Sequence, residues 1–69
     1  MKVKLLNDGG FSFLQHLSFP IEIDAKPNPR LDNSILVKSI DLVAVGAGDN
    51  CKNLFHWHFA DDEFEVVNE

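Results

Sequence analysis

Two histidines in the last third of the chain, His56 and His58, are the first candidates for chemistry. They stand two positions apart in an alternating stretch, so on a β-strand both imidazoles project from one face, about 6.5–7 Å apart. That spacing can chelate a metal ion, and Cys51 or His16 could complete the ligand set. A zinc site normally has a second ligand pair at loop spacing, which this sequence lacks. We therefore expect no metal and no cofactor, and keep His56, His58 and Cys51 as the alternative metal-binding set.

The single cysteine, Cys51, is also the one candidate for a nucleophile. A reactive thiolate needs a neighbouring cation or a helix N-terminus to stabilise it, and the sequence offers Lys52 but predicts no helix. A chain of 69 residues also has little volume in which to bury a substrate. We expect a non-catalytic protein in which Cys51 is a loop or packing residue.

Four carboxylates cluster near the end of the chain, at Asp61, Asp62, Glu63 and Glu65. As a catalytic pair they lack a cleft, and adjacent residues in a turn point apart. Two interpretations stay open. The cluster is either the solvated tip of a hairpin or an acidic patch that meets a protein partner with a basic surface.

The overall charge is negative and unevenly distributed. Eleven acidic residues against six basic ones give a net charge of −5, which argues against a general nucleic-acid binder. Residues 1–38 carry five basic and four acidic side chains, whereas residues 39–69 carry one and seven. The second part of the chain therefore supplies any functional electrostatic surface.

An aromatic segment follows the glycine pair at positions 9 and 10. Phe11, Phe13 and Leu14 can form an exposed apolar loop, and exposed aromatic side chains at a loop often anchor an interface. Six phenylalanines are many for a small core, so we expect one or two to be partly exposed. The alternative is that these three side chains plug the core.

The elements that must position these residues are short strands. Polar and apolar residues alternate with period two in most segments between the turn-rich stretches, which indicates half-buried strands. The predicted strands are residues 2–6, 17–25, 35–38, 43–45, 55–59 and 63–66. Pro20 cannot donate a hydrogen bond to a ladder, so its strand lies at a sheet edge or is bulged.

The last two strands are expected to form a terminal hairpin around Asp61 and Asp62. In that register Phe59 pairs with Phe64 and Trp57 with Val66 on one face, while His58 faces Glu65 on the other.

Short strands without a helix longer than one turn predict an all-β protein, and an SH3-like barrel of five to six strands is the first choice. The barrel would be one domain over residues 1–69. The expected core is Val3, Leu5, Phe19, Ile21, Ile23, Ile35, Val37, Val43, Val45, Phe55, Trp57, Phe59, Phe64 and Val66.

No apolar run reaches the length of a membrane span, and a turn at residues 7–10 ends the basic and apolar start too early for a signal peptide. With one cysteine and hence no internal disulfide, a cytoplasmic location is expected.

Three segments also carry a family resemblance. Residues 2–11, 19–23 and 57–67 read KVKLLNDGGF, FPIEI and WHFADDEFEVV. Together they resemble short acidic proteins of tailed bacteriophages and prophages, which open on a glycine-terminated strand, carry a Phe-Pro strand and close on an aromatic and acidic ending. Such proteins generally lack an assigned activity. Because they come from phages and prophages, the resemblance implies a bacterial host cell as the setting.

The sequence therefore predicts a protein-interaction module, an accessory protein that binds and modulates a host protein. Its expected contacts are the acidic hairpin and the loop from Phe11 to Leu14. A metal-binding protein using His56 and His58 is the first alternative. The second is a structural subunit that forms homo-oligomers through the edge strand beside Pro20.

Overall fold

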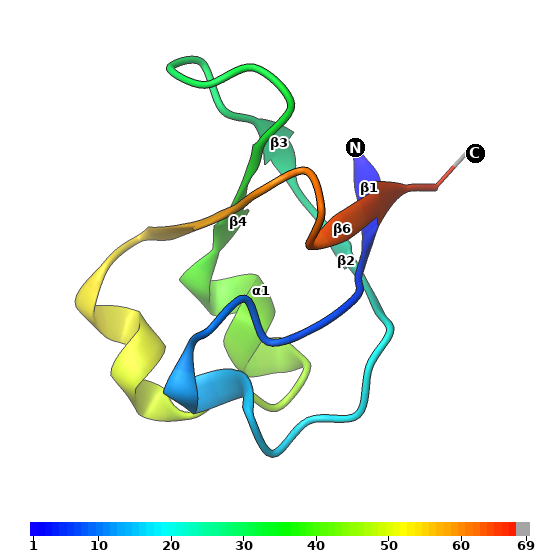
Figure 1. The fold of residues 1–69 in the computed structure, drawn as a ribbon. Coiled ribbons are helices and arrows are strands. Elements are labelled where there is room, and N and C mark those ends of the chain that lie inside the picture. Colours follow the sequence, from blue (N-terminus) through cyan, green and yellow to red (C-terminus); the bar gives the residue numbers. More distant parts are fainter. Residues whose placement is uncertain (68–69) are drawn as a thin grey trace.

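Two three-stranded antiparallel sheets form the framework of the protein in the computed structural model, which describes residues 1–67 (Figure 1). In the first sheet, β1 (Lys2–Leu5) lies between β2 (Ile21–Asp24) and β6 (Phe64–Val66). Because side chains alternate along a strand, β1 directs Val3 and Leu5 into the core, where both are fully buried.

The second sheet is built around β4 (Ile35–Lys38), whose bounds agree with the predicted strand. It lies between β3 (Lys26–Pro27) and β5 (His56–Phe59). The register places Ile35 opposite Phe59 and Lys38 opposite His56. β4 therefore buries one face and ends at a lysine on the surface.

Three short helices gather at the end of the molecule away from the chain termini (Figure 1). They are the 3-10 turn η1 (Ser12–Leu14), the helix α1 (Ser39–Ala44) and the 3-10 helix η2 (Asp49–Asn53). The expected strand at residues 43–45 is wrong, because α1 begins directly after β4 and extends to Ala44. Burial of Ser39 and Leu42, three positions apart on one helix face, outweighs the β preference of the valines.

The expected terminal hairpin is also wrong. A turn does form, in which the Glu63 amide donates to the Ala60 carbonyl at 2.9 Å. The strands on either side of it then enter different sheets: Phe59 lies opposite Ile35, and Phe64 lies opposite Leu5. Alternation determines which face of a strand is buried but not which strand it joins, so both arrangements fit the same pattern.

The protein is thus mostly β with little helix, as expected. Within residues 1–67 the strand pairing gives two separate sheets and no closed barrel. The predicted strand at residues 17–25 is shorter than expected. It starts at Ile21, directly after Pro20, and it does lie at a sheet edge.

The core lies between the sheets and the helices. Of the expected core, six residues are buried: Val3, Leu5, Ile23, Ile35, Val37 and Phe59. The helical segments and the connection between α1 and η2 add five that the alternation did not predict: Phe13, Leu14, Leu42, Ala47 and Cys51. Two expected core residues are instead exposed, Val66 at 57% and Phe55 at 86%. Val66 ends an edge strand, and Phe55 lies just before β5 begins.

Candidate functional site

A shallow apolar groove of about 610 Å³ lies where β4 passes into α1 and η2 leads into β5. Its lining comes from these four elements and the short segment before β5. The lining residues are Lys38, Ser39, Ile40, Val43, Lys52, Phe55 and His56. The groove therefore joins segments that are distant in sequence.

Backbone hydrogen bonding holds the two sides of the groove together. The Ser39 amide donates to the Phe55 carbonyl at 2.8 Å, so the first residue of α1 is tied to the residue before β5. Next to this bond, Lys38 and His56 lie opposite each other in the strand register. The end of the second sheet, where Lys38 pairs with His56, therefore holds the segments that carry Ile40 and Phe55.

The apolar side chains of the groove are unusually exposed. Phe55 is 86% and Ile40 is 72% accessible to solvent. α1 turns Ser39 and Leu42 into the protein, which leaves Ile40 on the outer face of the helix. Single exposed apolar residues are ordinary on protein surfaces, but Ile40 and Phe55 line one hollow.

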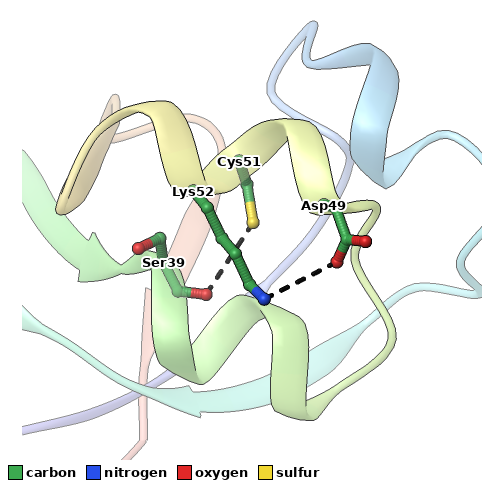
Figure 2. Close-up of polar contacts among 4 residues, drawn as sticks. All are labelled: Ser39, Asp49, Cys51 and Lys52. Carbon is green, nitrogen blue, oxygen red and sulfur yellow. Dashed lines mark hydrogen bonds and ion pairs between the residues drawn. The ribbon is translucent and has the colours of Figure 1, made fainter.

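Basic and imidazole groups line the same groove, at Lys38, Lys52 and His56. Lys52 is the only lysine or arginine in residues 39–69. Its ammonium lies 3.8 Å from a carboxylate oxygen of Asp49, one turn earlier on η2 (Figure 2). Both side chains are largely exposed, so this ion pair contributes little to stability and leaves the ammonium available.

Cys51 lies beneath this surface. Its side chain points from η2 towards the start of α1 (Figure 2), where the thiol donates a long hydrogen bond of 3.8 Å to the Ser39 carbonyl. The Cys51 carbonyl accepts a hydrogen bond from the Trp57 indole at 2.7 Å. Cys51 is fully buried, which confirms the packing role.

A chemical test of this placement follows from thiol accessibility. We expect Cys51 in the folded protein to react with Ellman's reagent far more slowly than in guanidinium chloride, because the buried sulfur must first be exposed by unfolding. Rapid stoichiometric reaction without denaturant would show that η2 does not cover the thiol. Free cysteine in the same buffer is the control for reagent quality.

The histidines of the predicted metal set differ from Cys51 in burial and from each other in their strand partners. His56 is half-buried at the groove and opposite Lys38, whereas His58 is exposed and opposite Leu36. Within residues 1–67, no three or more His, Cys, Asp or Glu side chains are arranged to hold a metal ion. His16, the other possible ligand, has its Nε2 atom 2.7 Å from the Gly46 carbonyl oxygen.

The predicted acidic cluster is divided by the structure. Asp61 and Asp62 are exposed in the turn between β5 and β6, and Glu65 is exposed on β6 opposite Lys4. Glu63 is different, because its carboxylate accepts the Ala60 amide at 2.8 Å and so belongs to the turn itself. His58 does not face Glu65, since the two residues lie in different sheets.

The expected exposed loop at Phe11, Phe13 and Leu14 is wrong for two of its members. η1 folds Phe13 and Leu14 into the core, and Phe11 is half-buried. The ring centroids of Phe11 and Phe13 are 5.3 Å apart, and that of Phe13 is 4.7 Å from the Trp57 ring. The other interpretation, that these side chains plug the core, is confirmed for Phe13 and Leu14, and Phe11 packs against that core.

The groove itself was not predicted, although the sequence contained one sign of it. The number of phenylalanines indicated that at least one would be exposed, and the exposed ring is Phe55 instead of Phe11 or Phe13. Alternation placed Phe55 in the core with Trp57 and Phe59. Nothing in the local pattern indicated that the chain turns outwards one residue before β5.

Comparisons of the chain with protein-family models, curated proteins and solved structures found no match. Within the described part of the chain, no helix has the length and apolar character needed to cross a bilayer.

Proposed function

We propose that the protein is a small non-catalytic protein-interaction module and that the groove around Phe55 is its contact surface. The observation that carries the proposal is the 86% exposure of the Phe55 ring beside Ile40 in one hollow. Exposing two large apolar side chains together is unfavourable in water, and covering them with a partner recovers that free energy. Aromatic residues in such positions commonly carry most of the affinity of an interface.

The composition of the groove supports binding over catalysis. Its lining supplies apolar surface, two ammonium groups and one imidazole, while Cys51 is buried beneath it. The acidic residues Asp61, Asp62 and Glu65 are a second proposed contact, which would attract a partner's basic surface before docking.

The proposed setting follows from the resemblance to phage and prophage proteins. In it, the module is an accessory protein in the cytoplasm of a bacterial host cell, where it binds and modulates a host protein. An SH3-like relationship is also part of the proposal. Two small antiparallel sheets with the first and last strands paired support that relationship.

The test is a substitution that removes the exposed ring. Phe55→Ser is expected to weaken binding to a partner by at least about tenfold, because hot-spot aromatics typically contribute 2 kcal/mol or more. Partners captured from bacterial lysate by the wild-type protein would be purified, and their affinities measured by calorimetry. Thermal unfolding should be little changed, since Phe55 has few buried contacts to lose.

Matched variants make the result specific to the groove. Leu31→Ser removes another exposed apolar side chain, outside the groove, and should leave binding unchanged. Asp61→Lys with Asp62→Lys tests the acidic turn while sparing the structural carboxylate of Glu63. A partner that is lost with the acidic variant but retained by Phe55→Ser would move the contact surface to the turn and overturn the groove proposal.

A further inference from the structure

We infer that the groove binds an acidic apolar segment of its partner, meaning a short stretch of chain with an aromatic or aliphatic side chain flanked by carboxylates. This inference rests on the proposed function and adds the chemistry of the partner. The groove combines the two features that such a segment requires. Ile40, Val43 and Phe55 supply apolar surface, and Lys38 and Lys52 supply positive charge.

The two lysines of the groove come from different elements of the fold. Lys38 ends β4 and lies opposite His56, whereas Lys52 extends from η2 (Figure 2). The imidazole of His56 adds a hydrogen-bonding group at the same surface. A partner with basic residues at these positions would instead place like charges against both lysines.

Carboxylates of the chain itself compete for these lysines. Asp49 lies 3.8 Å from the Lys52 ammonium, but the pair is exposed and screened by solvent. Asp24 and Asp41 line a neighbouring hollow that Lys38 also borders. A carboxylate of a bound segment would lie partly out of water, where its attraction to an ammonium is stronger than that of an exposed pair.

The charge of the whole chain makes this positive surface a local exception. The chain carries −5 overall, yet the one lysine of its acidic second part lies at the groove. A nucleic acid would bring a continuous line of phosphates against the remaining negative surface. A short segment with a few carboxylates can satisfy the lysines without that repulsion.

A second copy of the chain is a poorer occupant than a partner segment. Its own acidic turn does carry carboxylates, but the aromatic residue next to that turn, Phe64, packs against the core. It is therefore not free to enter a groove, and Val66, although 57% exposed, is held in β6 by its pairing with β1. Two copies would also each carry −5, which opposes their association.

The inference can be tested by selecting from a random peptide library displayed on phage particles, with the immobilised full chain as target. Clones that also bind the Phe55→Ser variant are removed by counter-selection. The remaining peptides are expected to be enriched in aspartate and glutamate around an aromatic or aliphatic residue. Synthetic versions of the enriched peptides serve as probes in fluorescence anisotropy.

Charge reversal in the groove then tests the role of the two lysines. Lys38→Glu with Lys52→Glu should weaken the selected peptides by roughly tenfold or more. Lys26→Glu with Arg30→Glu changes the net charge by the same amount at exposed positions outside the groove, and should have a much smaller effect.

The possible outcomes separate the two proposals. Groove-dependent peptides that are neutral or basic would overturn the acidic partner while the interaction module stands. A library that yields no peptide dependent on Phe55 would overturn both. Concentration-dependent self-association that Phe55→Ser abolishes, measured by analytical ultracentrifugation, would show that a second copy occupies the groove and would also overturn the inference.

Discussion

Replacing Phe59 with alanine is expected to remove most of the free energy of unfolding of the protein. The Phe59 side chain is fully buried and is the largest of the fully buried side chains. It lies opposite Ile35 in the second sheet, and its ring centroid is 5.5 Å from that of Phe11. Truncating a buried phenylalanine costs about 3–5 kcal/mol, whereas a single domain of this size has a net stability of only about 5 kcal/mol.

Urea unfolding followed by Trp57 fluorescence would measure this effect, since the one tryptophan packs against Phe11 and Phe13. Phe55→Ala is the matched control, because it removes the same ring from an exposed position four residues earlier. We expect the control to change the free energy of unfolding by less than about 0.5 kcal/mol. Equal losses for the two variants would contradict the observed placement of these rings.

The second large effect is expected at Gly9, in the turn after β1. Its φ of +61° lies in the left-handed region, and a Cβ atom would lie 2.9 Å from Cε2 of the Phe59 ring. Gly9→Ala therefore combines backbone strain of about 1–2 kcal/mol with an overlap that costs about 1–3 kcal/mol more. The buried ring cannot move away easily, because the core packs around it.

Gly10→Ala separates the two contributions. Gly10 also has a positive φ, of +82°, but a Cβ atom there would meet nothing within 4 Å. This variant should be destabilised only by the backbone strain. Its free energy of unfolding, measured by heat or urea, should therefore be clearly higher than that of Gly9→Ala. If the two variants were equally stable, the close approach of Gly9 to Phe59 would be disproved.

The sequence was most informative where one local rule decides the structure. β4 has its predicted bounds because residues 35–37 are a run of β-branched and apolar residues, and the strand ends at the lysine after them, Lys38. The turn at residues 7–10 forms as expected, with the side chains of Asn7 and Asp8 accepting the amides of Gly9 and Gly10 at 2.8 Å.

It was least informative where tertiary packing chooses between local options. Leu42 enters the core from a six-residue helix that is too short to show helical periodicity. β5 and β6 alternate correctly but pair with β4 and β1, which no local pattern can specify.

The candidate site shows the same limit. The carboxylates and histidines were visible because their residue types suggest chemistry. The groove depends on a contact between Ser39 and Phe55, which are far apart in the sequence, and on an aromatic ring that turns outwards. Neither property can be derived from composition or spacing.

The central position of β1 in the first sheet has a consequence for biosynthesis. β1 pairs with β2 early in the chain, but its other edge is covered only by β6, with Val3 opposite Val66. During translation this edge stays open until Phe64–Val66 have left the ribosome, so the nascent chain exposes one unpaired edge of β1 until then. Stop codons placed just before β6 should therefore yield aggregated rather than merely shortened protein.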